Sequence, residues 1–249
     1  EKYPSISPYA YCAGNPVNLV DPDGKRTYVK QIGNGVYEVV GGVLDNDLNV
    51  YVTYTDSNGK LITCESIGKT ISPYSFYNTD GKDPQDRNWA YGSKIDLNDN
   101  SGVNFLDYFE NKGRPVLIEY MVNARNGHKY DFKATNGMSH LPFPPLDIYR
   151  GMSIGTDNGN KIIASARDIG NIAAGYVAGA NGLVWNLSRD AFDGYQYYTD
   201  IKSDWKGVGY SLPTFKREGL STQVPEKYGW EKGYNYYLTF NRIFWYENF

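Results

Sequence analysis

The feature that most constrains the fold is a run of small residues inside residues 165–198, a segment with helical character at its start and again from Leu183. Glycine costs a helix about 1 kcal/mol relative to alanine, so this is a poor helix on propensity alone. Small residues are useful where another element must approach the helix backbone closely. We therefore predict a helix pressed against a close neighbour. The small residues are Ala173, Ala174, Gly175, Ala178, Gly179, Ala180 and Gly182.

The rest of the second half of the chain carries weaker signals. A second helix is predicted over Ser221–Tyr237, because Pro225 is tolerated in a first helical turn. The aromatic residues 238–249 are interpreted as a docking strand or tail. The prolines of residues 142–145 predict a stiff connector, and the polar, glycine-containing residues 151–159 predict a turn.

The first half of the chain has the character of β-structure. The sequence contains 27 Gly and 24 Tyr, and short β-branched or aromatic runs alternate with turn residues. One hairpin is predicted between residues 51–54 and 61–63, a short helix over Ser101–Glu110, and a strand over Val116–Val122. The predicted fold class is α+β: a β-rich segment over 26–125, followed by a mainly helical segment over 126–249.

Charge and composition narrow the possible functions. The formal net charge is −3 and the sequence pI is about 5.5, so no basic block steers the chain to nucleic acid. No apolar run is long enough to span a membrane. The sequence has no His-Glu-x-x-His, cysteine-pair or acidic calcium-loop spacing, so it predicts no metal centre and names no cofactor.

The first candidate site is the start of the small-residue helix. On a helix, Arg167, Asp168 and Asn171 can share one face. A carboxylate there can act as a general base and a guanidinium can stabilise an anionic transition state. The same residues allow a structural alternative, because Ser165-x-x-Asp168 matches a capping box.

The second candidate site follows the Asn126-Gly127 turn. If the chain continues as a strand, Lys129, Asp131 and Lys133 share one face and His128 lies on the other. Lysines flanking an aspartate can bind a phosphate. The alternatives are a solvated face with weak ion pairs and a surface histidine. A two-histidine ribonuclease mechanism would need His128 and His140 to meet.

Residues 1–25 consist of turns, with Asn15-Pro16, Asp21-Pro22 and Asp23-Gly24 among them. The stretch resembles the end of the core region of Rhs repeat proteins, whose pattern is Tyr-Ala-Tyr-Cys-x-x-Asn-Pro-Val-Asn-x-x-Asp-Pro-Asp-Gly. The resemblance implies that residues 1–25 are a remnant of an Rhs shell. In that family the shell encloses a C-terminal toxin and cuts it free after this motif.

Residues 130–237 resemble the polymorphic-toxin type 44 family in three elements. The first is Tyr130-Asp131-Phe132-Lys133, and the second is Asp168-x-Gly170-Asn171 with the glycines that follow. The third is a looser pattern beginning at Pro225, preceded by Ser221-Thr222-Gln223 where relatives carry an acidic pair. The matching residues of the second and third elements also include Gly175, Tyr176, Gly179, Gly182, Gly229, Gly233 and Tyr237.

The two resemblances imply a secreted or cell-surface-delivered effector that acts in the cytoplasm of competitor cells. The implied activity is a nuclease, with RNA favoured over DNA, and the implied partners are a cognate immunity protein and the parent Rhs shell. The expected catalytic residues are Asp168, Arg167, Asn171, Asp131 and Lys133, and the expected substrate-binding residues are His128, Tyr176 and Gln223. A glycan or peptidoglycan hydrolase toxin and a non-enzymatic Rhs tip remain as alternatives.

Overall fold

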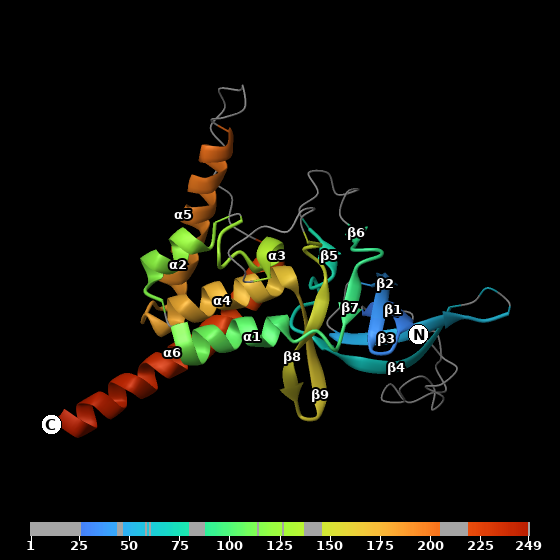
Figure 1. Ribbon diagram of the computed structural model, residues 1–249, viewed down its shortest axis with the longest axis horizontal. Coiled ribbons are helices and arrows are strands. Elements are labelled where there is room, and N and C mark those ends of the chain that lie inside the picture. Colours follow the sequence, from blue (N-terminus) through green and yellow to red (C-terminus); the bar gives the residue numbers. More distant parts are fainter. Residues whose placement is uncertain are drawn as a thin grey trace, which may run out of the picture.

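The computed structural model describes residues 26–43, 47–57, 59, 61–79, 88–113, 115–125, 127–136, 146–204 and 219–248. The Rhs-like stretch, the 142–145 connector and His140 lie outside this part of the chain. The described residues form a β-barrel beside a group of helices (Figure 1). This confirms the predicted α+β class with a β-rich N-terminal part.

Seven strands close the barrel in the order β1-β2-β7-β8-β9-β4-β3. Their bounds are β1 Thr27–Gly33, β2 Val36–Gly42, β3 Asn49–Thr55, β4 Leu61–Thr70, β7 Lys94–Asp96, β8 Gly151–Asp157 and β9 Asn160–Ser165. Pairing is antiparallel except at β1–β3, β4–β9 and β7–β8. A short ribbon joins β5, Tyr77–Asn78, to β6, Asn88–Trp89. The barrel is filled by Val29, Val39, Val50, Phe76, Trp89, Ile95 and Ile163.

The β3–β4 hairpin pairs Thr53 with Thr63 and Tyr54 with Ile62, which confirms the hairpin predicted there. The polar residues 151–159 do not form the turn that the sequence suggests. They form β8, and only Asn158 and Gly159 turn the chain, both with positive φ. The outer end of β8 is exposed, so its polar side chains are compatible with a strand that pairs with β9. Strands from both sides of residue 125 therefore build the barrel.

The helices are α1 Ser101–Asp107, its π-helical continuation η3 Tyr108–Gly113, α2 Leu117–Asn123, α3 Phe132–Thr135, α4 Ala166–Ala180, α5 Trp185–Asp204 and α6 Leu220–Asn248. Helix α4 begins where β9 ends, so the barrel and the helices share one continuous element. The helices enclose a second core, which contains aromatic side chains from α1, η3, α2, α3 and the turn before α3, with Phe105, Phe109, Tyr120, Tyr130 and Phe132 among them.

Three further predictions of secondary structure are wrong. Residues 117–123 form helix α2 and not a strand, because Tyr120 packs into the core while Ile118 and Val122 face outward at helical spacing. The expected strand through 128–133 is a turn followed by α3. The chain from 238 continues α6 as far as Asn248. Tertiary packing overrides the β propensity of these residues.

The small-residue helix α4 crosses α6 at very short range, as predicted (Figure 1). A Cβ atom added to Gly175 would lie 1.8 Å from the carbonyl oxygen of Glu226, and one added to Gly229 would lie 2.0 Å from that of Ile172. Gly179 and Gly233 meet backbone atoms of the opposite helix in the same way. Glycines on both helices therefore allow the two backbones to touch.

Candidate functional site

The capping box predicted at the start of α4 is present. The Oγ of Ser165 accepts a hydrogen bond from the backbone N–H of Asp168 at 3.2 Å, and Oδ2 of Asp168 accepts one from the backbone N–H of Ser165 at 3.3 Å. Both side chains are fully buried. Asp168 therefore stabilises the first turn of the helix. This is the structural alternative that the sequence offered to a catalytic role.

Arg167 joins the barrel to the helices. Its guanidinium donates to the backbone carbonyls of Tyr74 and Tyr77 and to the hydroxyl of Tyr149, and it lies 5.1 Å from the centre of the Tyr149 ring. The side chain is only 6% exposed. These contacts tie the segment after β4 to the start of α4, so Arg167 is occupied by structural interactions.

Burial raises the pKa of the Asp168 carboxyl above its ordinary value of 3.8, while the nearby Arg167 charge and hydrogen bonds from Ser75 and Ser165 oppose this. The folded protein therefore binds this proton more tightly than the unfolded chain does. As pH falls from neutral through the raised pKa, Asp168 should stabilise the wild type relative to the Asp168→Asn variant. Urea unfolding of both proteins across that range measures this difference. A difference that stays constant or reverses would contradict the prediction.

The remaining candidates lie at several places. Asn171 is partly buried on α4, Tyr176 is 5% exposed in the helical core, and Gln223 is partly buried in the first turn of α6. The aliphatic part of the Lys133 side chain passes beside Gly170 of α4, and the backbone carbonyl of Lys133 accepts a hydrogen bond from Arg150. The structure therefore does not gather these residues into one cluster.

Asp131 and His128 shape a tight turn. Oδ2 of Asp131 accepts a hydrogen bond from the backbone N–H of Gly127 at 2.8 Å, and the hydroxyl of Thr135 donates to the backbone carbonyl of Asp131. Asp131 is 6% exposed, whereas His128 is exposed. The turn fixes the two residues between them, Lys129 and Tyr130.

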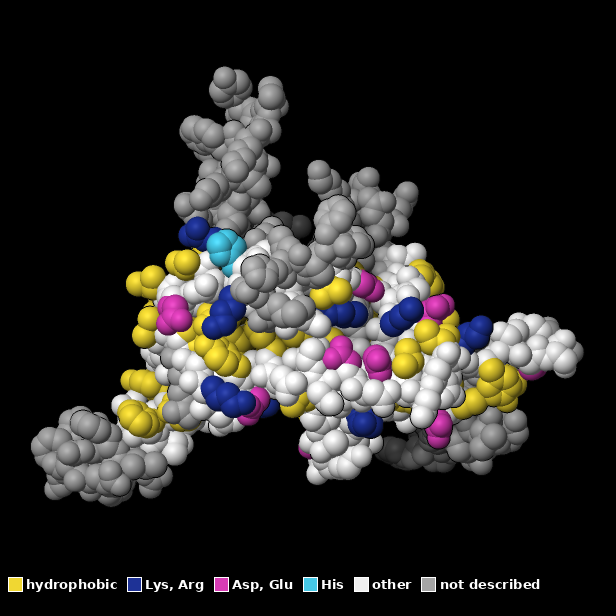
Figure 2. All heavy atoms as spheres, viewed as in Figure 1, with side chains coloured by type: hydrophobic (Ala, Val, Ile, Leu, Met, Phe, Trp, Pro, Cys, Tyr) yellow, Lys and Arg dark blue, Asp and Glu magenta, His cyan; other side chains and the backbone are white. Residues whose placement is uncertain are grey.

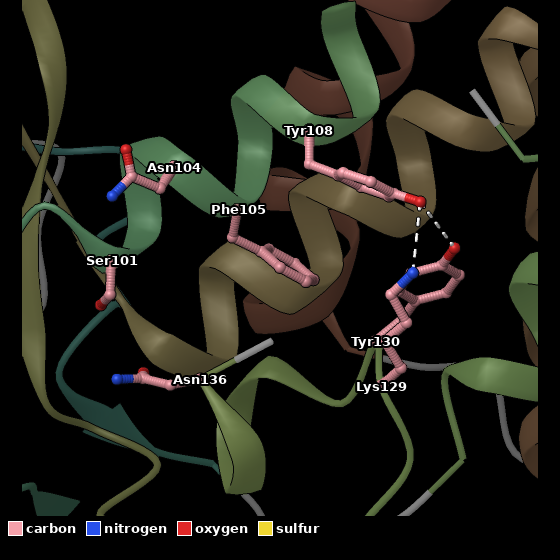
Figure 3. Close-up of a pocket in the computed structure, with 7 residues that line it drawn as sticks. All are labelled: Ser101, Asn104, Phe105, Tyr108, Lys129, Tyr130 and Asn136. Carbon is pink, nitrogen blue, oxygen red and sulfur yellow. Dashed lines mark hydrogen bonds between the residues drawn. The ribbon is translucent and has the colours of Figure 1, made fainter. Parts of the chain in front are cut away.

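Lys129 and Tyr130 line a pocket of about 290 Å³ between α1 and α3 (Figure 3). Phe105 forms an aromatic surface in it, and Tyr108 lies across from Tyr130. Polar side chains from the start of α1 and the end of α3 complete the lining. The seven lining residues are Ser101, Asn104, Phe105, Tyr108, Lys129, Tyr130 and Asn136.

The polar end of the pocket is held by Arg150. Its guanidinium donates to the side-chain oxygen of Asn136 and to the carbonyls of Phe132 and Lys133. Asn136 ends α3 in the left-handed region, with φ of 54°. Because Arg150 uses the amide oxygen, the amide nitrogen is the group of Asn136 that can donate to a ligand.

The other end of the pocket is a cluster of two phenols and an ammonium. The hydroxyl oxygens of Tyr108 and Tyr130 lie 3.4 Å apart, and Nζ of Lys129 donates to the Tyr108 hydroxyl at 3.3 Å (Figure 3). Hydrogen bonds from Tyr130 and Lys129 lower the pKa of Tyr108. Burial, together with the hydrogen bond to Tyr108, raises the pKa of Tyr130.

None of the eight residues expected from the sequence is among the seven that line this pocket. Two lining residues, Lys129 and Tyr130, fall between the candidates His128 and Asp131, and Tyr130 is the first residue of a motif element. Tyr108 and Asn136 had no sequence signal, because only folding brings η3 and the end of α3 to Lys129. The motif therefore reached the pocket through Tyr130, and the other motif residues of this element lie beside the lining.

Comparison of the chain with protein-family models, with curated proteins and with solved structures finds no match. Within the described part of the chain, no group of three or more His, Cys, Asp or Glu side chains is placed to hold a metal ion. Among the described helices, none has the length and apolar character needed to cross a membrane.

Proposed function

We propose that this chain is the end of an Rhs-type polymorphic toxin, whose effector domain cleaves RNA in competitor cells and is neutralised at home by an immunity protein. The pocket between α1 and α3 is the proposed active site. The observation that carries the proposal is the cluster of Lys129 with Tyr108 and Tyr130, which combines a phosphate-binding cation with proton-transfer groups in one pocket.

The three elements that resemble the toxin family also lie together. The first element, 130–133, runs into α3, which packs on α4, the second element. The third element lies in α6, which crosses α4 through the paired glycines. The family-like residues thus build one helical layer, and the pocket adjoins its first element. This arrangement supports a role of the motif glycines in packing.

The lining suits a nucleotide. A base can stack on Tyr108, which is only partly buried, since stacking on an aromatic ring contributes about 1–3 kcal/mol per base. The amides of Asn104 and Asn136 offer hydrogen bonds to base edges or ribose hydroxyls, and Lys129 offers a charge to a phosphate. Lysine and arginine side chains on the face drawn in Figure 2 are dispersed among acidic ones. Recognition is therefore expected to depend on the pocket more than on a basic surface.

The glycan-hydrolase alternative receives less support from this pocket. Most glycosidases need a pair of carboxyl groups beside the scissile bond. None of the seven described lining residues is Asp or Glu. Two carboxyl groups are adjacent to lining residues in sequence, and both have other partners: Asp131 is used by the Gly127 turn, and Asp107 accepts a hydrogen bond from Asn111 and pairs with Lys112.

Expression of the chain in the bacterial cytoplasm tests the proposal. We expect growth arrest with degraded total RNA and intact DNA. The Lys129→Ala variant should slow RNA cleavage by about 10²-fold, because it removes a charge aimed at the phosphate. Lys161→Ala, at an exposed position on β9, is the matched control and should cleave normally.

Three results would contradict the proposal. Growth arrest with intact RNA would exclude a ribonuclease. Lysis only after export to the periplasm would favour a glycan or peptidoglycan hydrolase. A chain without any toxicity, and without cleavage of purified RNA, would favour a non-enzymatic tip.

A further inference from the structure

The phenol pair in the pocket has an asymmetric environment. Tyr130 is 3% exposed and stacks on the ring of Tyr120, whereas Tyr108 is only partly buried and faces the pocket. Nζ of Lys129 lies 4.8 Å from the centre of the Tyr108 ring and 5.1 Å from that of the Tyr130 ring. Tyr108 is thus the member of the pair that a ligand can reach, with a cation beside it.

The hydrogen bonds within the pair and from Lys129 favour loss of the proton from Tyr108, and they outweigh the partial burial of Tyr108, which acts in the opposite direction. Hydrogen bonds from Tyr130 and then from Lys129 lower the pKa of Tyr108, while burial raises the pKa of Tyr130. Glu119 of α2 opposes ionisation of both phenols. Tyr130 therefore stays protonated, and its hydroxyl donates a hydrogen bond to the Tyr108 oxygen. The Tyr108 oxygen can carry a negative charge because it accepts hydrogen bonds from both Tyr130 and Lys129.

We propose that Tyr108 is the general base of the proposed ribonuclease, that Lys129 is its general acid, and that Tyr130 positions and stabilises the Tyr108 oxygen. The inferred substrate class is a strand with a ribose 2′-hydroxyl at the cleaved position. This inference rests on the proposed function and adds to it the reacting groups and the chemistry of the products.

The reaction balances without a further reagent. The Tyr108 phenolate takes the proton of the 2′-hydroxyl, and the 2′-oxygen forms a bond to phosphorus. The bond from phosphorus to the 5′-oxygen breaks, and the Lys129 ammonium protonates that oxygen. The products are a 2′,3′-cyclic phosphate and a 5′-hydroxyl. Tyr108 then returns its new proton to Lys129 along their 3.3 Å hydrogen bond.

The substrate requirement is tested with purified full chain on short RNA strands. We expect cleavage that leaves cyclic phosphate and 5′-hydroxyl ends, and no cleavage where a single 2′-deoxy sugar precedes the cleaved bond. Cleavage of the deoxy position, or products with a 5′-phosphate, would overturn this inference and leave the proposed nuclease standing. A wild-type chain that cleaves no RNA would overturn both.

Three variants test the roles of the groups. Tyr108→Phe should lower the cleavage rate by about 10²- to 10⁴-fold, the usual effect of losing a general base. Tyr130→Phe should move the rise of the rate with pH to higher pH, with recovery in alkali, whereas a purely structural loss would lower the rate at every pH. Tyr120→Phe, a buried neighbour outside the pocket lining, is the control and should cleave normally.

A titration of tyrosine ultraviolet absorbance tests the base independently of activity. The wild type should contain a phenol that ionises at lower pH than the others, and Tyr108→Phe should lose it. Lys129→Gln, which keeps both phenols, should shift the ionisation of this phenol to higher pH. Wild-type activity in Tyr108→Phe, or identical titrations of wild type and both variants, would refute the role of Tyr108.

Discussion

Replacing Gly175 with valine is expected to lower the free energy of unfolding by at least about 3 kcal/mol, the upper end of the usual cost of overpacking. A Cβ at this position would lie 1.8 Å from the carbonyl oxygen of Glu226, and the next nearest atoms also belong to the α6 backbone. A flexible side chain could move aside, but a backbone cannot without separating the helices. Separation would open the contacts along the whole α4–α6 crossing.

The control for this prediction lies on the same helix. A Cβ added to Gly170 would meet only Cγ of Lys133, at 4.0 Å. Gly170→Ala should therefore stabilise the protein by about 0.5–1 kcal/mol, because alanine is the better helix former. Urea unfolding monitored by circular dichroism measures both variants. Equal stability of Gly175→Val and wild type would show that α4 and α6 do not cross at this distance.

The second large effect is expected at the buried ion cluster between α5 and α6. Arg189 donates to the carboxylates of Asp193, at 2.6 Å, and Glu226. The three side chains are 10%, 1% and 4% exposed. Arg189→Met should cost about 3–5 kcal/mol, because it removes a positive charge that lies within hydrogen-bond distance of two buried carboxylates.

A double variant separates the loss of the cluster from a simple packing defect. Arg189→Met combined with Glu226→Met also removes one of the two buried carboxylates and should be more stable than Arg189→Met alone. The exposed pair of Lys232 and Glu110, 3.6 Å apart, supplies the control, and Lys232→Gln should change stability by no more than about 0.5 kcal/mol. A double variant with a lower free energy of unfolding than Arg189→Met would contradict this account of the cluster.

Much of the local structure was predictable because its cause is local in the chain. The capping box needs only Ser165 and Asp168, three residues apart. The hairpin of β3 and β4 needs alternating residues around a short connection. These signals failed at residues 117–123, where β-branched residues such as Val122 suggested a strand and contacts of Tyr120 with distant aromatic rings selected a helix.

The pocket was less predictable than the fold. The motif Tyr130-Asp131-Phe132-Lys133 pointed to its neighbourhood, but the sequence suggested Asp131 and Lys133 as the reactive groups. In the structure, Asp131 caps a turn and presents Lys129 and Tyr130 instead. Their partner, Tyr108, is 22 residues from Tyr130, and no periodicity in the sequence relates the two.

The sequence by itself determined the α+β class, the capped start of α4 and the need for a backbone to approach its glycines, because propensity, capping and steric size act over a few residues. Tertiary structure alone decided that α6 is the approaching backbone, that β8 and β9 complete the barrel, and that Tyr108 meets Tyr130 and Lys129. Those outcomes depend on side chains that are distant in sequence and are buried together. Local signals are compatible with several arrangements of the elements, and burial of these side chains selects one of them.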